Sequence, residues 1–112
     1  METNMISNFE DVWKSIKSQL KIGDLIKNWT PLNGYFGNDV VIHNVNNDSI
    51  TIQTKSAKYP QQLMKKEFKE IWEIWSSYIS GKIKRSELRA NRFHTTYIID
   101  ILHWYEVNKN KT

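Results

Sequence analysis

The sequence predicts a single α+β domain, because helix-like and strand-like patterns fill separate stretches of one short chain. Apolar residues recur at helical spacing over residues 9–20 and again after residue 60, whereas β-branched residues cluster between residues 40 and 55. A chain of 112 residues can bury one core, and its two prolines and four glycines leave little room for a linker. We therefore expect one domain over residues 1–112, built as a helix, a small antiparallel sheet of about three strands, and then helices.

The first helix is predicted over residues 9–20. Asn8 can cap its first turn by accepting a backbone N–H, and Gly23 can end it in a left-handed conformation. The apolar residues are spaced i, i+3, i+4, i+7 and i+11, which places them on one face: Phe9, Val12, Trp13, Ile16 and Leu20. The segment is expected to pack on the core through this face.

A β-hairpin is predicted at residues 40–55. Two runs rich in β-branched residues, 40–45 and 50–55, flank a turn-forming cluster of asparagine, aspartate and serine. A two-stranded ribbon alone is marginally stable, so a third strand is expected. The segment Leu25–Trp29 and the region around Tyr35 and Phe36 are both candidates for that strand.

Helices are predicted for the rest of the chain. A long helix is expected over residues 60–80, where apolar and aromatic residues repeat at helical spacing until Ser80 and Gly81. A short helix around Arg85–Ala90, a break at residues 91–94 and a last helix from Thr95 or Thr96 follow. The last two helices form a helical hairpin that resembles a helix-turn-helix unit.

The sequence offers few groups that could carry catalysis. There is no cysteine, which excludes a thiolate metal site and a thiol nucleophile, and neither a phosphate-binding loop nor a nucleophile elbow is present. Asp100 and His103 stand i, i+3 on the last helix and could supply two metal ligands or an orienting pair. A metal needs a third and a fourth ligand, so a pair on the surface is the simpler interpretation. We expect a non-enzymatic protein without catalytic residues, metal or cofactor.

The chain is expected to be cytoplasmic, with no membrane partner. Its first eight residues contain neither the basic segment nor the apolar segment of a signal peptide. No apolar run approaches the ~20 residues that a helix needs to span a bilayer. The chain has no cysteine and therefore no disulfide framework of the kind that is typical of secreted proteins.

Positive charge is concentrated in one segment of the chain. Residues 1–54 hold four lysines against six acids, whereas residues 55–112 hold twelve basic residues against six acids. All three arginines lie within residues 82–92, where Glu87 is the only acid. We call this the basic segment, and its positive residues are Lys82, Lys84, Arg85, Arg89 and Arg92. Arginine binds phosphate and guanine in bidentate geometry, so the cluster favours a surface that binds nucleic acid.

The helical hairpin sharpens this hypothesis. In a helix-turn-helix unit the first turn of the second helix reaches the base edges, which would place Thr95 and Thr96 near the bases. The basic segment would then lie on the phosphates. A plain helical hairpin whose exposed face is basic explains the same residues, because charge runs are commonly solvated faces.

Tryptophan is frequent, with five in 112 residues. Trp72 and Trp75 stand one turn apart within the apolar stripe of the long helix, and their simplest interpretation is core. The alternative is that they line, with Trp104, an aromatic pocket for a small ligand or a protein partner. The excess of aromatic residues also predicts a homodimer, with its seam at the hairpin edge or on the exposed side of the long helix.

The C-terminal half carries a recognisable pattern of packing residues. It consists of Phe68-x-x-Ile71-Trp72-x-x-Trp75-x-x-Tyr78, then Gly81-x-Ile83-x-Arg85-x-x-Leu88, then Thr96-Tyr97-Ile98-Ile99-x-Ile101-Leu102-His103. The pattern resembles that of small bacterial proteins encoded in integron gene cassettes and similar mobile elements, and the segments Asn28-Trp29-Thr30 and Gly34-Tyr35 are similar to it too. The resemblance implies a bacterial, cytoplasmic protein of mobile-element origin, and it carries no active-site residues.

Overall fold

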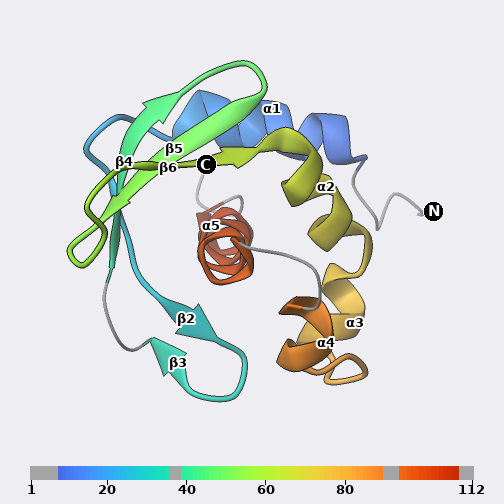
Figure 1. The fold of residues 1–112 in the computed structure, drawn as a ribbon. Coiled ribbons are helices and arrows are strands. Elements are labelled where there is room, and N and C mark those ends of the chain that lie inside the picture. The colour runs from blue at the N-terminus through green and yellow to red at the C-terminus, as the bar shows by residue number, and fades with distance from the viewer. Residues whose placement is uncertain (1–7, 36–38, 90–93, 109–112) are drawn as a thin grey trace.

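The computed structural model confirms the α+β class and describes residues 8–35, 39–89 and 94–108. The helices of this part of the chain are α1 (Phe9–Gln19), α2 (Lys65–Glu73), α3 (Trp75–Ile79), α4 (Arg85–Arg89) and α5 (Thr95–Asn108). The strands are β1 (Leu25–Ile26), β2 (Trp29–Thr30), β3 (Gly34–Tyr35), β4 (Val40–Val45), β5 (Ser49–Thr54) and β6 (Gln61–Met64). Helix α5 occupies the centre, between the large sheet, the β2–β3 ribbon and helices α2 to α4 (Figure 1). No helix of the described ranges is long and apolar enough to cross a membrane.

The first helix forms as predicted except at its end, because α1 stops at Gln19 with Leu20 extended, and Gly23, at φ 95°, lies in the turn that follows. The Asn8 side chain accepts a hydrogen bond from the Glu10 N–H at 2.7 Å, which caps α1, and the predicted apolar face is buried. Trp13 packs against Phe68 of α2, with ring centroids 5.1 Å apart. The Trp13 indole also donates to the Asn47 carbonyl oxygen at 2.8 Å, so the helix is fastened to the hairpin turn.

The large sheet is antiparallel, with strand order β1-β4-β5-β6. The predicted hairpin is confirmed as β4 and β5. Both candidates for a third strand form strands, but in different sheets: Leu25 pairs with Val41 in the large sheet, whereas Trp29 pairs with Tyr35 in a separate two-stranded ribbon. Strand β6 covers the β5 edge of the hairpin, whereas β1 pairs only with Val40 and Val41 of β4, and the dimer seam at the hairpin edge stays a prediction.

The predicted helix over residues 60–80 is wrong at its beginning. Residues 61–64 form strand β6, with Leu63 buried and paired opposite Ile50 while Met64 faces outward. Leu63 and Met64 fit a helical pattern as well as a strand pattern when the sequence is considered alone. They form a strand because they pair with the edge of β5. Helix α2 then begins at Lys65, where the Glu67 carboxylate accepts the Met64 N–H at 2.8 Å.

The same predicted helix is interrupted in its middle. Ile74, at φ −116° and ψ 12°, leaves the helical conformation and separates α2 from α3. Its N–H bonds to the Ile71 carbonyl at 3.1 Å, three residues back, which closes the first helix with a tighter turn. The predicted end is confirmed, because Gly81 follows α3 with φ 88°.

Candidate functional site

A pocket of about 350 Å³ lies beside α5, within the size range of small-molecule sites. Asp100, His103, Trp104 and Val107 follow one another at i, i+3, i+4 and i+7, so a single face of α5 supplies half of the lining. The other residues come from β1, β3, the segment after β1 and the end of α5: Leu25, Tyr35, Lys27 and Asn108.

Asp100 is the buried carboxyl of this pocket. Its side chain is 1% exposed, and Oδ1 accepts the backbone N–H of Trp29 at 2.9 Å. Burial raises the pKa of Asp100 to about 7, and the charge of Asp39 adds to the rise, while the Trp29 N–H and the charge of Arg85 oppose it. The prediction of a surface pair is therefore wrong for Asp100, because the sheet and the ribbon cover α5.

His103 lies next to Asp100 on the pocket face and is also sheltered. Its ring stacks on Trp29 at 3.7 Å with an interplanar angle of 6°, and Nε2 lies 3.0 Å from the Tyr35 hydroxyl. Burial lowers the pKa of His103 below its ordinary value, against the opposing charge of Glu106. The imidazole is therefore neutral at neutral pH, and one of its nitrogens shares a hydrogen bond with the tyrosine.

The β2–β3 ribbon closes one side of the pocket. Such a ribbon is too small to be stable alone, and it is held to α5 by the bond from Trp29 to Asp100, the stacking of Trp29 on His103 and the Tyr35–His103 hydrogen bond. The tight turn of the ribbon is supported by Gly34 at φ 71°. The polar groups of the pocket therefore also position the wall that covers them.

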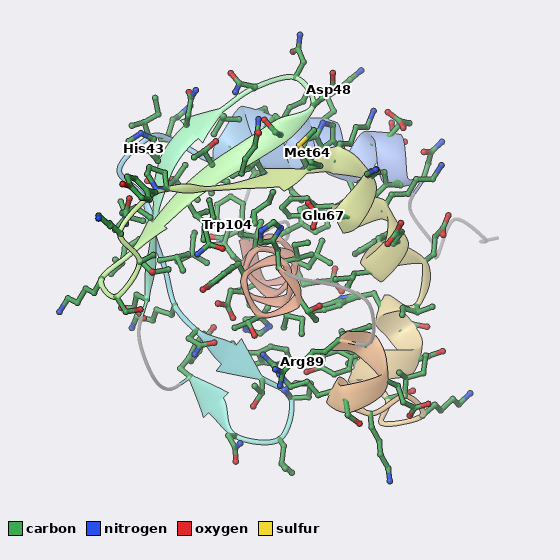
Figure 2. All side chains as sticks on the ribbon, in the orientation of Figure 1. His43, Asp48, Met64, Glu67, Arg89 and Trp104 are labelled. Atoms are coloured by element: carbon green, nitrogen blue, oxygen red, sulfur yellow. The ribbon has the colours of Figure 1, made fainter. Side chains whose placement is uncertain are left out.

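Trp104 contributes an aromatic ring to the pocket, and Lys27 contributes a positive charge. Trp104 is half-buried and projects from the central helix (Figure 2). Lys27 is exposed, and its Nζ lies 5.9 Å from the centroid of the Tyr35 ring. With Asp100 buried and Lys27, Leu25 and Val107 exposed, the carboxyl lies at the floor of the pocket and the ammonium at its rim.

Of the three tryptophans predicted to line a pocket, Trp104 lines this one, whereas Trp72 and Trp75 are not among its lining residues. Trp75 is 3% exposed and belongs to the core, which confirms the simpler interpretation. Trp72 is half-buried and packs edge-on against Tyr105, with ring centroids 6.1 Å apart. This pocket is therefore built around Trp104 and not around the Trp72 and Trp75 stripe.

The basic segment divides into exposed and engaged residues. Lys82, Lys84 and Arg89 are exposed, and Arg89 projects from α4 (Figure 2). Arg85 is half-buried and donates to the Tyr78 hydroxyl at 3.1 Å and to Thr96 Oγ1 at 3.0 Å. The guanidinium of Arg85, which was predicted to bind phosphate, is engaged in this conformation by contacts that join three helices. Arg92 lies outside the described residues.

Neither Thr95 nor Thr96, the residues of α5 that were predicted to lie near the bases, is exposed in this structure. Thr95 is buried at 3% exposure, and Thr96 accepts the bond from Arg85. Within α5 only Val107 is exposed, because the helix passes through the centre of the molecule (Figure 1). A recognition helix needs an exposed face that enters the major groove, and α5 has none.

The pocket does not supply a metal site of ordinary composition. In the described ranges no three His, Cys, Asp or Glu side chains are grouped closely enough to hold a metal ion. Asp100 and His103 stand together without a third such ligand, and Tyr35 occupies the Nε2 side of the imidazole.

The chain matches no protein family, no curated protein and no solved structure. The resemblance to integron cassette proteins and the mobile-element origin therefore stay predictions. The pocket residues that sequence reasoning missed are Leu25, Lys27, Tyr35, Val107 and Asn108, whereas Asp100 and His103 were singled out as a pair but expected on the surface. One signal pointed to Asp100, since an acid that stands between Ile99 and Ile101 in an apolar run is a candidate for burial.

Proposed function

We propose that this protein is a binding module for a small organic molecule, and that its site is the pocket beside α5. The observation that carries the proposal is the convergence of a buried carboxyl, a neutral imidazole and a tyrosine hydroxyl on a pocket with an aromatic wall. An apolar cavity with a few oriented polar groups is the usual form of a small-molecule site. A carboxyl with a strongly raised pKa in such a cavity adds support.

Binding is proposed in preference to catalysis. No serine, threonine or cysteine nucleophile is among the described lining residues. The imidazole shares one nitrogen with Tyr35 and stacks on Trp29, so its contacts orient the ribbon. The proposal keeps the aromatic pocket expected from the sequence and moves its centre from Trp72 and Trp75 to Trp104.

Indole is a suitable first probe, because it is flat, neutral and small enough for a pocket of about 350 Å³. The five tryptophan indole N–H groups give five resonances in a ¹H–¹⁵N NMR spectrum. We expect saturable shifts of Trp104 and Trp29, while Trp13 and Trp75 in the core stay unchanged. Trp104→Ala should abolish the shift of Trp29, whereas the matched variant Trp72→Ala should keep it. Saturable shifts centred on Trp72 would place the site elsewhere.

We propose weak, non-specific nucleic-acid binding as a second function, and the observation that favours it is the exposure of Lys82, Lys84 and Arg89. These residues can neutralise phosphates without reading bases. The proposal is narrower than the one drawn from the sequence, because Arg85, Thr95 and Thr96 are occupied or buried. Titration of a DNA duplex at several salt concentrations tests it, because binding to phosphates weakens as salt rises.

A further inference from the structure

The charge of the pocket varies with depth. The buried carboxyl of Asp100 lies at the floor, the half-buried rings of His103 and Trp104 form the walls, and the exposed ammonium of Lys27 stands at the rim. A ligand that enters the pocket therefore meets a carboxyl at its inner end and a positive charge at its outer end.

We propose that the pocket selects flat aromatic molecules that carry one protonated amine, with the amine placed against the Asp100 carboxylate and the ring against Trp104. This inference rests on the proposed binding function and names the chemical class of its ligand.

The groups around Asp100 leave its negative charge poorly compensated. The positive charge of Arg85 on α4 lowers the pKa of Asp100, but the hydrogen bonds of its guanidinium go to Tyr78 and Thr96. Asp39, which precedes β4, adds a second negative charge. From α5 His103 contributes a neutral ring, and from the ribbon Tyr35 contributes a hydroxyl and Trp29 a backbone N–H.

A protonated amine on the ligand would neutralise the negative charge of Asp100, which the surrounding side chains do not. It gives the carboxylate a counter-charge and several hydrogen-bond donors, which offset the cost of ionising a buried acid. An anionic ligand would instead place two like charges together at the floor. The rings of Trp104 and Tyr35 add cation–π and stacking contacts. Lys27 at the rim disfavours a second positive charge, so a monocation fits best.

The inference predicts a pH dependence of binding. Asp100 titrates with a pKa of about 7, and a cation binds its ionised form. Below that pH, binding must release the proton of Asp100, so affinity should rise with pH and level off above the pKa. For one proton the rise is roughly tenfold between pH 6 and pH 8. A neutral ligand that does not engage the carboxylate should show no such rise.

Three indole derivatives test the charge preference with one ring. Tryptamine carries an ammonium that stays protonated over this pH range, indole is neutral, and indole-3-acetate carries a carboxylate. We expect tryptamine to bind at least about tenfold more tightly than indole-3-acetate at pH 8, as one close ion pair implies in a partly buried site. The measurement is calorimetric or NMR titration of the full chain at pH 6, 7 and 8.

Asp100→Asn is the decisive variant, because the asparagine carbonyl can still accept the Trp29 N–H. Tryptamine should then bind no better than indole, and its pH dependence should vanish. The matched control is Asp11→Asn, which removes one exposed carboxylate of α1 outside the pocket and should change neither property. The pH series on the unaltered chain tests the same point should Asp100→Asn fold poorly.

The possible results distinguish an error in the ligand class from an error in the binding site itself. Saturable binding of indole or indole-3-acetate in the pocket, with tryptamine weaker or equal, would overturn the cation preference and leave the binding site standing. A tryptamine affinity that is flat from pH 6 to 8 would also overturn it, because Asp100 would not be the partner. Failure of all three compounds to shift Trp29 or Trp104 would overturn the inference together with the proposed site.

Discussion

Asp100 makes the stability of the folded protein depend on pH. Its pKa is about 7 in the folded chain and near the ordinary 3.8 when unfolded, so between these values the folded state binds more protons. The free energy of unfolding therefore falls as pH rises from about 4 to about 7 and is flat above, with the decline at most about 4 kcal/mol. Asp100→Asn should lose this decline. Urea denaturation of both proteins at pH 5 and pH 8 measures it, and parallel pH profiles would contradict the burial of the charge.

Trp75 and Trp72 should differ in their contribution to stability although they stand three residues apart. Trp75→Ala removes a ring that is 3% exposed and should cost about 3–5 kcal/mol. Trp72→Ala should cost clearly less, since part of that ring already contacts solvent. The Trp75 Nε1 group has no hydrogen-bond partner among the described residues, so Trp75→Phe should recover most of the loss. Chemical denaturation ranks the three variants, and equal costs for Trp72→Ala and Trp75→Ala would contradict the core assignment.

At the scale of elements, Arg85 fastens the C-terminal helices together. Its guanidinium extends from α4 to Tyr78 of α3 and Thr96 of α5. Arg85→Ala should leave two sheltered hydroxyls without this donor and cost about 1–3 kcal/mol. Arg89→Ala, on the exposed side of the same short helix, should change stability by less than about 0.5 kcal/mol. Thermal unfolding measures the melting temperature of the two variants. Equal decreases in melting temperature would show that the contacts of Arg85 do not stabilise the fold.

The ribbon and α5 are also coupled as elements. Trp29 stacks on His103, and Tyr35 forms a hydrogen bond with the same histidine. The backbone N–H of Trp29 also donates to Asp100, so one face of α5 positions the whole ribbon. The pocket is a consequence of this docking, because β1, the ribbon and α5 meet along it. Any ligand that binds there should reinforce the same contacts.

At the scale of the whole molecule, the exposed basic residues predict a weak electrostatic association with duplex DNA. Neutralising three phosphates with Lys82, Lys84 and Arg89 gives a slope of roughly −2.7 for log affinity against log salt. Replacing all three by alanine should flatten the slope, whereas Arg85→Ala should leave it unchanged. Fluorescence anisotropy on a labelled duplex at several salt concentrations measures the slope. No binding at low salt, or equal slopes for the two variants, would remove this function.

Self-association stays a prediction. Both expected seams are reduced in extent, because β1 and β6 cover part of the hairpin edge and Trp75 lies in the core, while Ile79 of the long-helix region is exposed. The exposed apolar residues Leu25, Tyr35 and Val107 gather around the ligand pocket. Sedimentation of the protein with and without tryptamine would show whether that rim also joins two copies.

Short-range patterns by themselves determined α1, the β4–β5 hairpin, the glycine after α3 at residue 81 and the α+β class. Each of these depends on residues that are close in sequence, such as the Asn8 cap or the alternation before and after the hairpin turn. Their physical causes, which are capping, periodicity and turn geometry, act within a few residues. The sequence also carried one signal for the site, namely the acid within an apolar helix.

Tertiary structure alone decided the rest. Residues 61–64 became a strand because β5 offered them an edge, and Asp100 became a buried acid because a sheet and a ribbon enclose α5. The pocket joins Tyr35 to His103, which are 68 residues apart in the chain. A local pattern records which face of a helix is apolar, but not which elements cover it, because burial on folding is a property of contacts between distant segments.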